Sequence, residues 1–174
     1  AQRWADLSEG DYGVALLNDC KYGHDIRDNV MRLTLLRAPK SPGKNADVNR
    51  THRFTYSILP HAGAYTNGVV RAGYELNVPA TAEVVKAKGG RLPARMSRMS
   101  VSGSNIVIDT VKQAEDDNGI IVRMYEAHGC RGRHEFVTDL PVKRVVETNL
   151  RRRKKNSWSC RTASWRWNLN RSRS

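Results

Sequence analysis

Five residues near the N-terminus have side chains and spacing suited to holding a polar ligand: Asn18, Asp19, Lys21, Tyr22 and Gly23. The first two can hydrogen-bond hydroxyl groups, Lys21 can donate hydrogen bonds, and Tyr22 can offer the face of its ring. They directly follow an apolar segment, residues 14–17, and loops held by rigid strands often carry binding groups. The alternative is that Asn18 and Asp19 only cap a turn, and the sequence leaves both interpretations open.

Histidine and cysteine residues do not form a clear metal-binding pattern. His128 and Cys130 could supply two ligands, but no second pair lies at a suitable spacing, and tetrahedral zinc needs about four ligands. An ordinary loop after a strand is the favoured interpretation of this segment. His61 and His128 each follow a predicted strand, so we expect loop histidines that hydrogen-bond the backbone rather than ligands.

Short strands separated by turns must position these residues. Apolar and polar residues alternate in 32–35 and in 54–58, which is the period of a strand with one buried face. Further strands are predicted over residues 69–78 and 136–146. Several short strands at such spacing predict an all-β fold, an antiparallel β-sandwich.

The clearest hairpin is predicted in the second half of the chain. Residues 106–111 and 120–125 are short segments rich in β-branched residues. Asn118 and Gly119 end the connection between them, and both residue types accept the positive φ that a hairpin turn needs. We therefore expect these two segments to pair in an antiparallel manner.

Charge is distributed unevenly along the 174 residues. Residues 151–174 hold nine Lys and Arg and no Asp or Glu, so the rest of the chain carries only +4 of the formal net charge of +13. The same segment contains three of the four tryptophans. The composition therefore predicts one folded domain over 1–150, followed by a basic tail over 151–174.

Cysteine content and hydropathy indicate the cellular compartment. Three cysteines, without a paired spacing, favour a reducing compartment such as the cytoplasm over a disulfide framework. No apolar segment approaches the roughly 18 residues of a membrane span, and the start lacks the features of a signal peptide. Because the first residue is not methionine, we expect the chain to be a piece of a longer protein.

The sequence closely resembles the C-terminal β-rich region of the cytosolic class of α-mannosidases in glycoside hydrolase family 38. The resemblance starts with the N-terminal segment Arg-Trp-Ala-Asp-Leu-Ser-Glu-Gly-Asp-Tyr-Gly-Val-Ala-Leu-Leu-Asn-Asp-Cys-Lys-Tyr-Gly-His-Asp. Six segments carry it in the same order: 3–25, 33–39, 53–61, 74–79, 109–115 and 123–129. The match covers most of the chain up to residue 150.

The resemblance implies that the catalytic centre lies outside this chain. In the family, the nucleophilic aspartate and the zinc ligands belong to an N-terminal catalytic domain, and no position here matches those motifs. Retaining glycosidases also need two carboxyl groups about 5 Å apart, and spacing alone selects no such pair here. We therefore assign no catalytic or metal residue, expect the chain to be inactive alone, and expect zinc only in the missing domain.

The partners follow from the same resemblance. They are the missing N-terminal catalytic domain and a mannose-containing glycan, hydrolysed at terminal α-linked mannose, with no membrane partner. In the wider family, a loop of the β-rich part reaches toward the sugar, and here that loop would be residues 18–23. Asn18 and Asp19 would then bind sugar hydroxyls.

The tail departs from the family, which continues with a Glu-rich segment and closing strands. Glutamate codons shifted by one base encode Arg and Lys, so a frameshift within such a segment would produce the basic run over residues 151–155. We expect such a tail to be disordered, to lack the closing strand and to leave a sheet edge free. The alternative is a genuine extension that makes the chain a basic binding module for nucleic acid or an anionic surface. The six matching segments favour the mannosidase interpretation, without a nucleic-acid partner.

Overall fold

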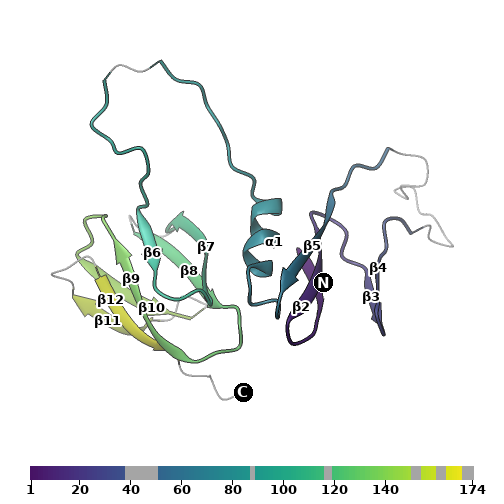
Figure 1. Ribbon diagram of the computed structural model, residues 1–174. Coiled ribbons are helices and arrows are strands. Elements are labelled where there is room, and N and C mark those ends of the chain that lie inside the picture. The colour runs from purple at the N-terminus through teal and green to yellow at the C-terminus, as the bar shows by residue number, and fades with distance from the viewer. Residues whose placement is uncertain (38–50, 87–88, 116–118, 150–153, 160–163, 170–174) are drawn as a thin grey trace. The chain divides into compact units, whose positions relative to one another are not determined.

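A computed structural model of the chain describes residues 1–37, 51–86, 89–115, 119–149, 154–159 and 164–169 (Figure 1). It divides into two compact units, Ala1–Val85 and Lys86–Ser174, rather than at residue 150. All the strand pairs in its described part are antiparallel. The prediction of an antiparallel β-rich fold is therefore confirmed, with one helix added.

The first unit is built on a three-stranded sheet. Its strands are β1 (Trp4–Ser8), β2 (Tyr12–Asn18) and β5 (Tyr56–Ala62), with β2 in the centre. A separate hairpin consists of β3 (His24–Arg27) and β4 (Val30–Leu33). The segment with the predicted ligand-binding residues thus leaves the central strand of the sheet and leads into this hairpin.

A helix, α1 (Val69–Asn77), occupies most of a segment predicted as a strand, residues 69–78, so that prediction is wrong. Val69, Ala72 and Leu76 recur at helical spacing and pack with the core of the sheet. The two adjacent valines favoured a strand by propensity. Burial of every third or fourth residue against the sheet outweighs that preference.

The three-stranded sheet has two faces, since side chains alternate along each strand and paired residues share a side. The helix face packs against α1, which Figure 1 shows beside the sheet. We define the helix face as Trp4, Asp6, Ser8, Gly13, Ala15, Leu17, Ser57, Leu59 and His61. We define the open face as Ala5, Leu7, Tyr12, Val14, Leu16, Asn18, Tyr56, Ile58, Pro60 and Ala62.

The second unit contains the predicted hairpin. Strands β7 (Ile106–Gln113) and β8 (Ile120–Glu126) pair in an antiparallel manner, as expected, with a register shift between Ile108 and Thr110. The turn residue Asn118 lies outside the described residues, and the backbone amide of Ala114 donates to the carbonyl oxygen of Gly119.

The predicted strand over 136–146 is divided in two. Strand β9 (Gly132–Thr138) precedes Pro141, and β10 (Arg144–Thr148) follows it. A short strand, β6 (Met99–Val101), pairs with β9. Because proline cannot donate a backbone hydrogen bond, an interruption at this position is expected.

Two strands form in the basic tail. Strand β11 (Lys154–Ser159) pairs with β10, and β12 (Ser164–Leu169) pairs with β9. The prediction that residues 151–174 contain no strand is therefore wrong for the described part of the tail, and its other residues lie outside the description. The physical reason is that backbone groups of β9 and β10 need partners along their length, and ladder bonds need no particular side chains.

Candidate functional site

Residues 18–23 form one loop that is tied to the rest of the first unit by backbone hydrogen bonds. The amide of Asn18 donates to the Arg3 carbonyl at 2.9 Å, and that of Thr34 donates to the Gly23 carbonyl at 2.8 Å. The five predicted residues therefore lie together at the end of β2, but their side chains have different surroundings.

Asn18 is fully buried, with 0% of its surface exposed. Its backbone carbonyl accepts a hydrogen bond from the Asn77 side chain at 2.9 Å. Neither Oδ1 nor Nδ2 of Asn18 has a hydrogen-bond partner within the described part of the chain. A buried polar group left in this state costs about 1–3 kcal/mol. The side-chain amide of Asn18 is therefore the group of this loop with the largest unmet hydrogen-bonding capacity among the described residues.

Asp19 has both a structural oxygen and a free one. Its Oδ2 accepts a hydrogen bond from the Thr55 amide at 2.9 Å, while the Asp19 amide donates to the Thr55 carbonyl at 3.2 Å. Hydrogen bonds from the Cys20 thiol and from Thr55 lower the pKa of Asp19, and the same carboxylate raises the pKa of Cys20. Oδ1 of Asp19 is buried with no partner among the described residues. The turn-capping interpretation thus accounts for one carboxylate oxygen only.

The other three predicted residues, Lys21, Tyr22 and Gly23, differ in how closely they contact neighbouring residues. Lys21 Nζ lies 5.0 Å from the centre of the Phe54 ring, and the Tyr22 side chain is exposed. A Cβ on Gly23 would lie 3.1 Å from Thr34 Cβ, so a side chain there would crowd Thr34, the residue that directly follows β4. His24, the residue that follows this loop, adds a buried Nε2 with no partner in the described residues.

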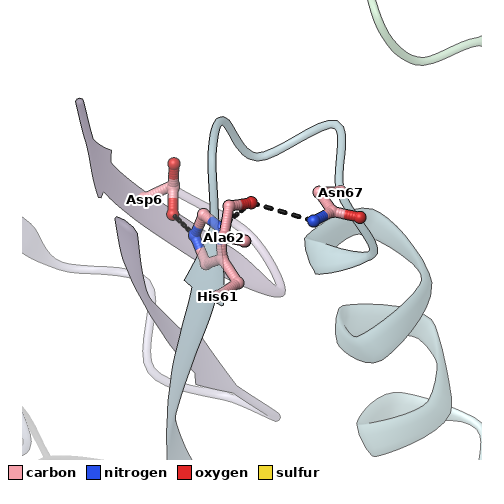
Figure 2. Close-up of polar contacts among 4 residues, drawn as sticks. All are labelled: Asp6, His61, Ala62 and Asn67. Carbon is pink, nitrogen blue, oxygen red and sulfur yellow. Dashed lines mark hydrogen bonds and ion pairs between the residues drawn. The ribbon is translucent and has the colours of Figure 1, made fainter. Parts of the chain in front are cut away.

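A second polar cluster, which the sequence did not indicate, lies on the helix face (Figure 2). His61 Nε2 and Asp6 Oδ1 are 2.7 Å apart, and each side chain is only 5% exposed. His61 lies within β5, so its predicted position in a loop is wrong. The predicted backbone hydrogen bond is present, since Nδ1 lies 3.5 Å from the Ala62 carbonyl oxygen, while Nε2 pairs with the Asp6 carboxylate. Figure 2 also shows Asn67 donating to the Ala62 carbonyl, at 2.9 Å. Each of the two side chains already has its partner in the other, and the pair joins β1 to β5 across β2.

A carboxylate in the second unit orders the segment around His128. Glu126 accepts hydrogen bonds from the Asn105 side chain at 3.0 Å and from the amides of His128 and Gly129 at 2.9 and 2.7 Å. Burial alone would raise the pKa of Glu126, but these hydrogen bonds outweigh it and the pKa is lowered. The interpretation of this segment as a structural loop agrees with this geometry.

Comparison with known proteins places the chain in a family. A model of the glycosyl hydrolases family 38 C-terminal domain matches residues 1–45, and one of the family 38 C-terminal beta sandwich domain matches residues 105–171. Alpha-mannosidase 2C1 of Mus musculus is 45% identical over 86% of this chain, and its Homo sapiens counterpart is 43% identical over 86%. The chain belongs to glycoside hydrolase family 38. Alpha-mannosidase G of Dictyostelium discoideum is 39% identical over 84% of the chain.

This family 38 chain spans only a small part of its relatives. It covers 14% of the length of the mouse, human and Dictyostelium proteins. The beta sandwich match extends into the tail, as far as residue 171, and thus includes both tail strands. The chain is therefore a C-terminal region of the family.

The described residues of this family 38 region contain no group of three or more His, Cys, Asp or Glu side chains able to hold a metal ion. Within the described part, no helix is long and apolar enough to cross a membrane. The loop over residues 18–23 remains the candidate site of the first unit.

Proposed function

We propose that this chain is the C-terminal part of an α-mannosidase that hydrolyses terminal α-linked mannose when joined to its catalytic part. The 45% identity to the mouse alpha-mannosidase over 86% of the chain carries this proposal. In it, the nucleophile and the zinc ion belong to the catalytic part, the substrate is a mannose-containing glycan, and the location is the cytoplasm. The chain itself supplies fold and contacts, not the reacting groups.

The finer proposal is that the loop over residues 18–23 contacts the sugar. It is supported by three side chains with buried polar atoms that lack partners within the described residues: both amide atoms of Asn18, Oδ1 of Asp19 and Nε2 of His24. An amide, a carboxylate oxygen and an imidazole nitrogen together can donate to and accept from neighbouring hydroxyl groups, as a sugar ring requires. A hydroxyl placed there would replace the hydrogen bonds that these atoms lost on burial.

A chimera tests both levels of the proposal. Residues 1–174 replace the matching part of the mouse alpha-mannosidase, and hydrolysis of 4-nitrophenyl α-D-mannoside is measured. We expect an active chimera, in which Asn18→Ala raises KM or lowers kcat at least tenfold. Asn67→Ala is the matched control, since the Asn67 amide already has a partner in the Ala62 carbonyl.

The two levels fail in different ways. An inactive but folded chimera, beside an active mouse enzyme, would contradict the mannosidase proposal. An active chimera whose kinetics Asn18→Ala leaves unchanged would keep the mannosidase proposal and remove the sugar contact. Folding is checked by urea unfolding of the separate 174-residue chain, because Asn18→Ala deletes a buried amide without a partner and should cost little stability.

A further inference from the structure

The open face of the three-stranded sheet is mainly apolar. None of its ten residues is charged, and its largest side chains face solvent: Ile58 is 65% exposed, and Tyr12 and Tyr56 are each 51% exposed, whereas Ala5 and Asn18 are buried. Single exposed apolar residues are common on protein surfaces, whereas contiguous patches mark places where another surface packs.

The strand register makes this patch contiguous. Leu16 is paired with Ala5 on one side and Ile58 on the other, and Val14 lies opposite Pro60. The Cβ atoms of directly opposed residues in an antiparallel sheet lie about 4.5–5.5 Å apart, so these side chains are neighbours across all three strands. The two tyrosines lie at opposite ends of the patch, since Tyr12 pairs with Ala62 and Tyr56 with Asn18.

The central strand supports the same conclusion independently. Strand β2 has the sequence Tyr-Gly-Val-Ala-Leu-Leu-Asn and contains no charged residue. A strand with one face in solvent alternates apolar and polar residues, whereas a nearly continuous apolar run is typical of a strand covered on both faces. Helix α1 covers one face of β2 through Val69, whereas Ile58 and the two tyrosines remain exposed on the open face.

We propose that the open face packs against the part of the α-mannosidase polypeptide that lies outside this chain. The length of that part is the reason for choosing it, because the chain spans only 14% of the mouse and human proteins. The surface that fits is apolar at its centre, where it meets Leu16 and Ile58. At its two ends it offers hydrogen-bond partners to the tyrosine hydroxyls, as such hydroxyls require when buried.

This inference rests on the proposed function in one respect, namely that the chain is part of an α-mannosidase. The test uses the tagged 174-residue chain and a mouse alpha-mannosidase from which the matching region has been deleted. The two pieces are co-expressed, captured through the tag, and examined both for a 1:1 complex and for hydrolysis of 4-nitrophenyl α-D-mannoside. We expect the complex to form, and Ile58→Asp to weaken it at least tenfold.

Two further variants define the surface. Tyr12→Asp changes the open face at its other end, on β2, and should also weaken the complex, so the test does not depend on one substitution. Ile120→Asp is the matched control, because Ile120 is a similarly exposed isoleucine, at 55%, in a strand of the second unit. Circular dichroism confirms that each variant folds.

Every outcome distinguishes the alternatives. Equal capture of the parent chain and both open-face variants would overturn the inference, as would the absence of a complex between two folded pieces. If the chain alone sediments as a dimer that Ile58→Asp dissociates, the occupant is a second copy of the chain and the proposed one is wrong. A complex that needs the open face but has no activity would retain this inference and count against the proposed function.

Discussion

The two faces of one sheet in the first unit differ in how far the rest of that unit covers them. On the helix face, Ala15 and Leu17 are buried with Val69 of α1, and the Trp4 ring stacks on that of Tyr65 at 5.4 Å. On the open face, Ile58 and the tyrosines remain exposed. An apolar sheet face indicates that another surface packs on it, but it does not identify that surface.

The two faces also differ in their charged residues. The helix face holds Asp6 and His61 as a buried pair, which only a fixed arrangement of β1 and β5 can satisfy. The open face has no charged group and fits any apolar surface of suitable shape. The helix face therefore fixes the arrangement of the strands, whereas the open face is suited to packing against another apolar surface.

The largest expected difference between the faces comes from two adjacent leucines of β2. Leu17 is 5% exposed on the helix face, and Leu16 is half-buried on the open face. Leu17→Ala should lower the free energy of unfolding by about 3 kcal/mol, because it leaves a cavity in the core. Leu16→Ala should cost about 1 kcal/mol, because solvent fills the space. Urea unfolding of the 174-residue chain measures both, and equal losses would contradict the division into two faces.

The next effect concerns the glycine beneath the buried pair. A Cβ on Gly13 would lie 2.4 Å from His61 Cε1 and 2.6 Å from Ser8 Cβ. Gly13→Ala should therefore push His61 away from Asp6 and cost about 2 kcal/mol. Gly10→Ala is the control, since nothing lies within 4 Å of a Cβ there, and it should stay within about 0.5 kcal/mol of the parent. Similar thermal stability of the two variants would show that His61 can move without loss.

The Asp6–His61 pair itself should show a smaller but measurable coupling. A double-mutant cycle of Asp6→Ala and His61→Ala should give an interaction free energy of about 1 kcal/mol or more, because both side chains are buried. The Arg71–Glu75 pair of α1 is the comparison, with 84% and 63% of the side chains exposed, and should give about 0.3 kcal/mol. A coupling for Asp6–His61 no larger than this value would show that the buried pair does not hold the strands together.

The strands could be predicted where short-range pattern and long-range pairing agree. Strands β7 and β8 have β-branched residues and a nearby turn, so their pairing follows from local sequence. Helix α1 could not be predicted in the same way. Its two valines favour a strand locally, and only the sheet beneath Val69 and Leu76 decides for the helix. The tail strands form through backbone pairing with β9 and β10, which composition does not report.

The candidate site could be predicted in position but not in detail. The residue types of 18–23 indicated a polar loop after a strand, and the structure gives that loop. The surroundings of these side chains depend on residues far along the chain: Asn18 is contacted by Asn77, 59 residues away, and one oxygen of the Asp19 carboxylate by Thr55, 36 residues away. The Asp6–His61 pair joins residues 55 positions apart and left no local signal.

The smallest expected effect is a pH dependence of the stability contributed by Asp19, which directly follows β2. Because the folded chain lowers the pKa of Asp19, its ionised form adds stability above the unfolded value of about 3.9. That contribution disappears as the pH falls through the lower pKa of the folded state.

Asp19→Asn keeps an oxygen for the Thr55 amide but cannot titrate, so Tm should fall less steeply with decreasing pH below about 4. Some slope must remain, because the pKa of Glu126 is also lowered. If Asp19→Asn and the parent lose Tm equally, the Asp19 contact with Thr55 does not stabilise the end of the sheet, and the loop is held by its backbone hydrogen bonds alone.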